Sequence, residues 1–165
     1  MKLTLLTAMI VTAAALVAAG VMQGNTAGNL PGFAYWSAAE LRGYEKPLRE
    51  KTGGEYKTAG IKLADYGSSN VAISHREANG FPEIHAHMDD YFVVQSGEAV
   101  LKIGGEVVNR RDTGPGEARG DAINGGEQRT LRQGDVVHIP CNMPHHLLVP
   151  KGKVFTYFVI KVKAK

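Results

Sequence analysis

The chain has 165 residues, 20 glycines and a formal net charge of +3. This length suits one domain with a sizeable hydrophobic core and is too short for two ordinary domains. The charged residues are dispersed, with no basic stripe interleaved with aromatic side chains, so the composition argues against a nucleic-acid-binding protein. The glycine content favours many short strands joined by tight turns.

The first 20 residues have the pattern of a secretory signal peptide. Lys2 precedes an uncharged apolar run that reaches Met22, with small residues around Gly20. We expect cleavage near Gly20 and an exported protein, periplasmic or secreted, with no membrane attachment after cleavage. The alternative is an uncleaved anchor, because the apolar run is just long enough to span a bilayer. Residues 21–34 predict a flexible lead-in, rich in glycine and asparagine.

Cys141 is the only cysteine. No disulfide can form within the chain, so the hydrophobic core alone must hold an exported domain of this size together. We interpret Cys141 as a small buried hydrophobic residue.

A short helix is predicted over residues 38–51. Ser37 and Glu40 have the spacing of a capping box, which typically marks the beginning of a helix. Apolar residues follow at helical spacing, but Pro47 interrupts the pattern. We therefore expect a short broken helix that lies against the rest of the domain and caps one end of it.

From Glu55 onward the apolar residues alternate as they do in strands. Gly104-Gly105 predicts a two-residue hairpin between 102–103 and 106–108. Such a number of short strands is typical of an all-β sandwich or barrel, in which the continuously apolar stretch 154–162 is a buried central strand. The predicted strands are 56–66, 70–75, 81–87, 90–96, 98–104, 106–109, 128–131, 136–139, 145–149 and 154–162.

Residues 110–127 have no apolar period and contain many charges. They predict a long surface loop that can carry a small hairpin of its own. Loops of this length in compact domains are either functional lids or disordered segments, and the sequence leaves both open.

All six histidines lie between residues 75 and 146. His85 and His87 are two residues apart, so both side chains point to one face if they lie in a strand. Imidazole ligates several first-row transition metals when a carboxylate or a third histidine completes the set. Taken alone, such a pair is as typical of a solvated strand face as of a metal site.

Two stretches resemble the two motifs of the cupin superfamily. Gly80–Gly97, GFPEIHAHMDDYFVVQSG, has the glycine, the His-x-His pair, an acid and the closing glycine of the first motif. Gly134–His145, GDVVHIPCNMPH, has the glycine, the proline and the histidine of the second. The resemblance covers residues 70–162 and implies an all-β cupin-type double-stranded β-helix, or jelly-roll barrel. With the short N-terminal helix, residues 35–165 then form a single cupin domain.

The resemblance also implies a ligand set for one divalent first-row transition metal (Fe, Mn, Zn, Ni or Cu). In the first motif the closing glycine follows the acid by seven residues, and counting back from Gly97 by that spacing selects Asp90 as the acid. Strand alternation from the histidines selects Asp89 instead. Glu83 is a third candidate that we interpret as an acid on the rim of the site. The implied metal ligands are His85, His87, Asp90 and His145.

Two positions depart from the second motif. Asn142 stands where the motif has glycine, and asparagine tolerates the left-handed backbone conformation that such a position often needs. Val149 stands where the motif ends in asparagine, a position that is not a ligand in the family.

The other histidines have weaker functional interpretations. His146 should face away from His145 and serve at the surface or in packing. His138, inside an apolar strand, is interpreted as a structural histidine. His75 is a candidate substrate contact if it faces the barrel mouth. We expect the interior, lined by residues such as Phe92 and Val94, to form a mostly apolar pocket around the metal.

The N-terminal pattern predicts export. The resemblance implies a metal-binding cupin barrel that is a metal-dependent enzyme of the dioxygenase, isomerase or lyase type, acting on a small molecule. One alternative is a non-catalytic module that binds a metal and a small ligand, and another is a barrel whose histidines bind nothing. Because cupins often pair through sheet edges, the resemblance also implies a homodimer. No catalytic residue and no organic cofactor is assigned.

Overall fold

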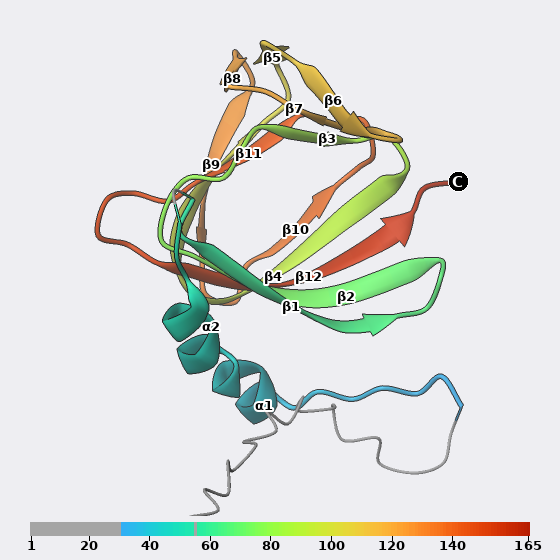
Figure 1. Cartoon of the computed structure of the whole chain (residues 1–165), viewed down its shortest axis with the longest axis vertical. Helices are drawn as coiled ribbons and strands as arrows, with labels where there is room; N and C mark the ends of the chain where they lie inside the picture. The colour runs from blue at the N-terminus through green and yellow to red at the C-terminus, as the bar shows by residue number, and fades with distance from the viewer. Residues whose placement is uncertain (1–30, 55) are drawn as a thin grey trace, which may run out of the picture.

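The computed structural model describes residues 31–54 and 56–165 (Figure 1). The predicted signal peptide, its alternative as an anchor and most of the predicted lead-in lie outside the described residues. In the part of the chain that is described, no helix is long and apolar enough to cross a membrane.

Two short helices, α1 (Ala38–Gly43) and α2 (Glu45–Lys51), form the predicted broken helix. The capping box is confirmed: the Glu40 N–H donates to the Ser37 hydroxyl, and the Glu40 carboxylate accepts from the Ser37 N–H at 2.7 Å. The break falls at Tyr44, and Pro47 lies in the first turn of α2, where a proline interrupts no hydrogen bond.

The rest of the described chain consists of strands joined by turns and loops, and every pair of neighbouring strands is antiparallel. They are β1 (Thr58–Asp65), β2 (Ser69–Arg76), β3 (Glu83–His85), β4 (Met88–Ile103), β5 (Glu106–Val108), β6 (Arg111–Gly114), β7 (Glu117–Arg119), β8 (Ala122–Asn124), β9 (Glu127–Arg132), β10 (Val136–Ile139), β11 (His145–Leu148) and β12 (Phe155–Lys163).

The long strand β4 joins the two halves of the main sheet. The sheet order is β1-β2-β12-β4-β11-β3-β7-β6, with β10 and β9 also paired to β4. The first half of β4 pairs with β12 and β10, and its second half pairs with β11 and β9. The sheet therefore curls around an enclosed interior (Figure 1). This confirms the predicted all-β cupin-type barrel with a short N-terminal helix.

β4 bends at Gly97, where two separate strands were predicted. Gly97 has a φ of 81°, and a Cβ at this position would lie 1.9 Å from the Val154 carbonyl oxygen. Only glycine can therefore bring the bend so close to the segment that precedes β12. At this glycine β4 passes from one half of the barrel into the other without ending, so the two predicted strands form a single long strand.

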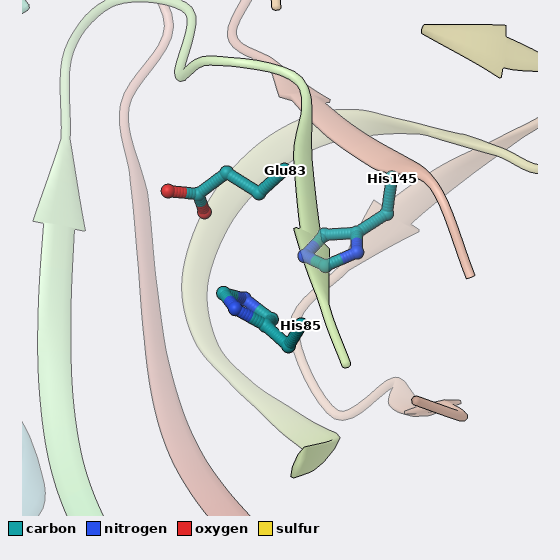
Figure 2. Close-up of side chains that lie close together, drawn as sticks. All are labelled: Glu83, His85 and His145. Atoms are coloured by element: carbon teal, nitrogen blue, oxygen red, sulfur yellow. The ribbon is translucent and has the colours of Figure 1, made fainter. Parts of the chain in front are cut away.

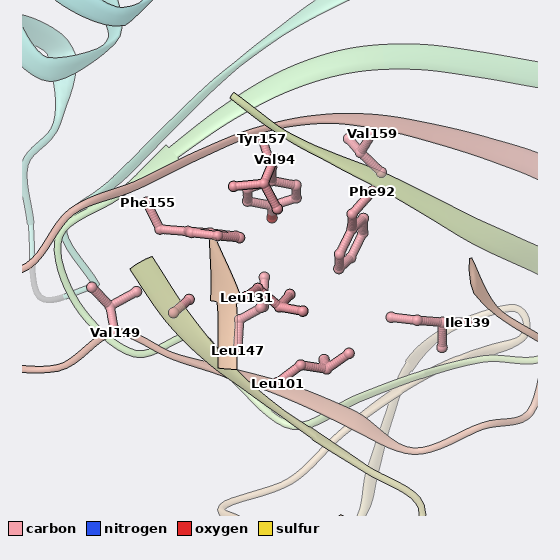
Figure 3. Close-up of a cluster of buried hydrophobic side chains, with 11 residues drawn as sticks. Phe92, Val94, Leu101, Leu131, Ile139, Leu147, Val149, Phe155, Tyr157 and Val159 are labelled. Atoms are coloured by element: carbon pink, nitrogen blue, oxygen red, sulfur yellow. The ribbon is translucent and has the colours of Figure 1, made fainter. Parts of the chain in front are cut away.

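The barrel interior holds the main hydrophobic core (Figure 3). β12 lies between β2 and β4, which confirms the buried central strand predicted over 154–162. Its inward side chains Phe155 and Tyr157 contact each other through their rings, and Tyr157 also contacts the ring of Phe92. The buried members of this core are Phe92, Val94, Ala99, Leu101, Leu131, Ile139, Leu147, Val149, Phe155, Tyr157 and Val159.

The helices cover the outer face of β1 and β2, which differs from the predicted cap over one end of the barrel. Leu48 of α2 is fully buried together with Ile73 of β2, and Tyr44 joins them. Burying a leucine side chain contributes about 1.5–3 kcal/mol, which is the main force that docks so short a helix.

The segment 110–127, predicted as a long loop, contains three short strands. β6 and β7 form a hairpin whose turn contains Pro115 and Gly116, and β7 pairs with β3. Gly104 and Gly105 both have positive φ and make the predicted turn. The strands on either side of that turn do not form the predicted hairpin, because β5 pairs with β8 instead.

Candidate metal site

Glu83, His85 and His145 converge inside the barrel (Figure 2). Glu83 and His85 lie two residues apart on β3, so they share a face, and β11 pairs beside β3 with His145 opposite Glu83. One ligand atom from each side chain lies within 4.8 Å of the others. Both histidines are buried and Glu83 is half-buried, so the cluster is largely withdrawn from bulk water.

Hydrogen bonds at Nδ1 fix the orientation of both imidazole rings. His85 Nδ1 lies 2.6 Å from Glu117 Oε2, and His145 Nδ1 lies 3.0 Å from the Met143 carbonyl oxygen. Because these oxygens accept, each Nδ1 carries the proton in the neutral ring, and Nε2 keeps a free lone pair. The buried Nε2 of His85 has no hydrogen-bond partner among the described residues. Carboxylate or carbonyl acceptors of this kind orient metal-binding histidines.

Asp90 borders the cluster and is itself held by a lysine. Its side chain is buried, with Oδ2 3.5 Å from His85 Nε2 and 3.9 Å from His145 Nε2. Lys161 Nζ lies 2.7 Å from both Asp90 carboxylate oxygens. Asp89 turns away, since its carboxylate accepts from the Cys141 N–H at 2.8 Å. Of the two rival acids, the structure therefore places Asp90 beside the histidines.

His87 does not join the cluster. β3 ends at His85 and the backbone bends at residues 86–87, so the expected continuous strand with both histidines on one face does not form. The Ala86 N–H donates to the Gly116 carbonyl at 2.7 Å, which ties the bend to the β6–β7 turn. The exposed His87 ring packs on Gly116, where an added Cβ would lie 2.4 Å from Cδ2 of the ring.

The electrostatics of the cluster favour metal-binding protonation states. Burial lowers the pKa of His145 below its usual value, against the opposing effects of its hydrogen bond to Met143 and the nearby Asp90. Burial acts to raise the pKa of Glu83, but its positively charged neighbours, protonated His145 and His85 together with Arg119 and Arg76, leave the pKa lowered. When the two rings are neutral, the arginines remain to oppose the effect of burial. A neutral imidazole and an ionised carboxylate are the forms that ligate metals.

Sequence reasoning missed two residues that support the cluster. Glu117 of β7 hydrogen-bonds to His85, and Arg119 of the same strand pairs with Glu83 through an Nη2–Oε1 distance of 2.9 Å. Both side chains reach the cluster because β7 pairs with β3. The available signal was the turn pattern Gly114-Pro115-Gly116 directly before Glu117, which marks a hairpin inside the predicted loop.

The remaining predicted residues lie away from the cluster. His75 does not face the barrel mouth as expected, because it is fully buried on the helix-covered side of β2, with Nδ1 2.8 Å from Thr156 Oγ1. His146 is buried and its Nε2 lies 2.8 Å from the Gly80 carbonyl, which agrees with a packing role. His138 lies on the exposed face of β10 and stacks on Tyr91. Cys141 is half-buried, so it is not the fully buried residue expected.

A cavity of about 160 Å³ adjoins the cluster inside the barrel. This volume is below the roughly 300–1,000 Å³ typical of pockets for drug-sized ligands, so the cavity suits a smaller molecule. Its wall is partly apolar as predicted, with Phe92 among the lining residues, but it also carries several charged groups. The lining residues are Ser74, Arg76, Gly80, Phe81, Glu83, Asp90, Phe92, His145, Leu147, Tyr157, Val159 and Lys161.

The backbone of the second motif is left-handed at Asn142, as its sequence predicts. Asn142 adopts a left-handed conformation with a φ of 61°, at the position where the family motif has glycine. Its N–H donates to the His85 carbonyl at 2.8 Å, so this turn contacts the end of β3 directly. The second motif thereby positions His145 and also holds the strand that carries His85.

No protein-family model matches the chain, and no curated protein sequence does. Solved structures are similar in fold. The protein TT1209 from Thermus thermophilus is 15% identical, with 72% of this chain and 92% of that chain covered and a TM-score of 0.51. The cupin-like protein tm1010 from Thermotoga maritima is 16% identical, with 67% and 75% covered and a TM-score of 0.49. Identities this low bear on the fold alone. Together with the curled antiparallel sheet, the similarity to TT1209 accords with the barrel that the two sequence motifs imply: this chain has the cupin fold.

Proposed function

We propose that this chain is a metal-binding cupin barrel that acts on a small molecule as a metal-dependent enzyme. The observation that supports it most directly is the buried Nε2 of His85, which has no hydrogen-bond partner among the described residues and lies in a cluster with His145 and Glu83. Leaving a buried polar atom unpaired costs about 1–3 kcal/mol. A cation bound at the cluster would satisfy it.

The metal would be held by His85, His145 and Glu83, with Asp90 beside them as a further oxygen ligand. This mixed nitrogen and oxygen set suits Fe, Mn, Zn, Ni or Cu. Such a metal supplies Lewis-acid chemistry, polarising a coordinated oxygen and lowering the pKa of bound water.

The chain's own residues contribute orientation and exclusion of water. Glu117 and the Met143 carbonyl fix the two rings, and Arg119 restrains Glu83. The apolar part of the cavity wall keeps bulk water from the cluster. Dioxygenase, isomerase and lyase chemistry are all compatible with this arrangement, because the fold does not select a reaction.

Metal content of single variants tests the ligand set. We expect His145→Ala and His85→Ala to lose most bound metal while the barrel stays folded, because the hydrophobic core does not depend on either side chain. Elemental analysis of protein purified without added metal measures the metal, and circular dichroism checks the fold. His138→Ala, an exposed histidine outside the cluster, is the matched control and should keep the wild-type metal content. Unchanged metal in both cluster variants would refute the ligand set.

The same measurement on His87→Ala separates two ligand sets. The motif resemblance includes His87, whereas the cluster of Glu83, His85 and His145 does not. We expect His87→Ala to retain its metal and Glu83→Gln to lose part of it. Metal loss in His87→Ala with retention in Glu83→Gln would restore the set implied by the motif.

A non-catalytic binding barrel is the second candidate, and the Asp90–Lys161 pair favours it. The Lys161 ammonium lies 2.7 Å from both carboxylate oxygens of Asp90, so it already balances the charge of that acid. Oxygen consumption and metal-dependent turnover over a panel of small molecules distinguish the two candidates. Stoichiometric metal without turnover of any compound would favour the binding module.

A further inference from the structure

We propose that Arg76 anchors a carboxylate of the ligand, so that the cavity takes a small organic acid. The inference deepens the proposed function and rests on it in one respect: the other end of the bound acid would contact the proposed metal. The anchor itself depends on residues that are not part of the metal cluster.

Arg76 differs from the other arginines of the strand region because it forms no ion pair with any of the described residues, 31–54 and 56–165. It lies at the end of β2 and lines the cavity, and its Nε–H donates to the Tyr157 hydroxyl at 3.2 Å. No carboxylate among the described residues lies within ion-pair distance of it. The remaining arginines from residue 58 onward each pair with an acid, namely Arg110, Arg111, Arg119, Arg129 and Arg132.

A half-buried guanidinium without a paired carboxylate retains unused N–H donors. Glu83 attracts Arg76 electrostatically, but its carboxylate is paired with Arg119. Lys161 also lines the cavity, and its charge is balanced by Asp90. Within the described part of the chain, Arg76 is therefore the cation of this wall that has no acidic partner and can receive an anion.

The shape and chemistry of the cavity point to a carboxylate on a short carbon skeleton. A planar guanidinium fork matches a carboxylate with two parallel hydrogen bonds. Phe92, Leu147 and Val159 provide apolar surface for the skeleton, and the volume of about 160 Å³ limits its length. His145 and Glu83 line the same cavity, so a short acid anchored on Arg76 can reach the cluster with its other end.

Malonate is the probe, titrated calorimetrically into metal-loaded protein. We expect saturable binding to the wild type and a loss of affinity on the order of 10- to 100-fold in Arg76→Met. Arg76→Lys, which keeps the charge and loses the fork, should fall between the two. Arg132→Met removes the same charge from a surface pair with Glu98 and should stay within about twofold of the wild type.

Equal malonate affinity in wild type and Arg76→Met would overturn the proposal, as would the absence of saturable binding to the wild type. Tighter, Arg76-dependent binding of inorganic phosphate would overturn the carboxylate assignment. If Arg76→Met does not fold, Tyr157→Phe replaces it: loss of the hydroxyl frees Arg76 Nε, and malonate affinity should change severalfold. An unchanged affinity in that variant and in Arg76→Lys would count against the anchor.

Titration of metal-stripped protein separates this proposal from the proposed function. A wild-type protein that holds no metal would refute metal-dependent chemistry. The anchor would still be supported if malonate bound the stripped protein and Arg76→Met weakened that binding. It would fail if malonate bound the stripped wild type and Arg76→Met equally well.

Discussion

At the scale of single residues, Asp90 is the acid whose removal should most lower the stability and the metal affinity of the protein. Its buried carboxylate balances Lys161 and lies 3.5 Å from His85 Nε2. Asp90→Asn leaves the lysine charge uncompensated, at a cost of roughly 2–3 kcal/mol, below the 3–5 kcal/mol typical of a fully buried pair because Lys161 is partly exposed. We expect a lower free energy of unfolding by urea titration and a lower metal affinity by competition with a chelator.

Asp89→Asn is the matched control for that experiment. Asp89 accepts a hydrogen bond from the Cys141 N–H, and an amide oxygen can still accept it. This variant should therefore lose less stability and less metal affinity than Asp90→Asn. The reverse order for metal affinity would mean that Asp89 is the ligand, as strand alternation suggested.

Part of the geometry of this cluster follows from the sequence, and the rest has physical causes; the ligand roles themselves stay predictions. His85 and His145 lie close together, as the resemblance of the two stretches to the cupin motifs implies. Glu83 is interpreted from the sequence as a rim acid, because the motif count assigns the acid ligand to Asp90 and strand alternation assigns it to Asp89. The bend at residues 86–87 depends on a hydrogen bond from Ala86 to Gly116, a contact between distant residues that periodicity does not reveal.

At the scale of elements, the bend in β4 should depend on Gly97. A side chain there would meet the Val154 carbonyl oxygen, at a φ that already disfavours one. We expect Gly97→Ala to destabilise the protein by roughly 3 kcal/mol or more, because β4 pairs with strands of both halves of the sheet and has little freedom to move away. Thermal and urea unfolding measure the loss.

Gly152→Ala separates the steric clash from the backbone strain. Gly152 has a similar φ of 78°, but an added Cβ would meet no atom within 4 Å. Its replacement should cost only about 1–2 kcal/mol, the penalty of the left-handed conformation alone. Equal losses in the two variants would show that the close approach to Val154 contributes nothing.

The element scale also shows where local patterns stop being informative. The capping box and the apolar run over 154–162 predict α1 and β12 because their signals lie within the segments themselves. β6, β7 and β8 have almost no buried side chains and therefore no apolar period. Their strand geometry comes from pairing with β3 and β5, which only the assembled barrel provides.

At the scale of the whole molecule, the curl of the sheet assembles the cavity from residues far apart in sequence. Arg76 and Tyr157 come from β2 and β12 in one half, whereas His85 and His145 come from β3 and β11 in the other. β4, which pairs with strands of both halves, fixes their separation. The proposed anchor and the proposed metal site thus lie on strands of opposite halves of one barrel.

The sheet ends on one side at β1 and on the other at β6, and each has a single neighbour in the main sheet. An unpaired strand edge is a surface through which two copies can associate. The homodimer implied by the family resemblance stays a prediction.

Export, the other prediction for the whole molecule, concerns residues outside the described part of the chain. When the full chain is produced in a bacterium with a general secretory pathway, we expect the exported protein to begin near residue 21, because cleavage requires the small residues that end the apolar run. N-terminal sequencing and intact mass measure this. Ala18→Arg should block processing and leave the full-length chain. A wild-type chain that keeps Lys2 and fractionates with membranes would establish the uncleaved anchor instead.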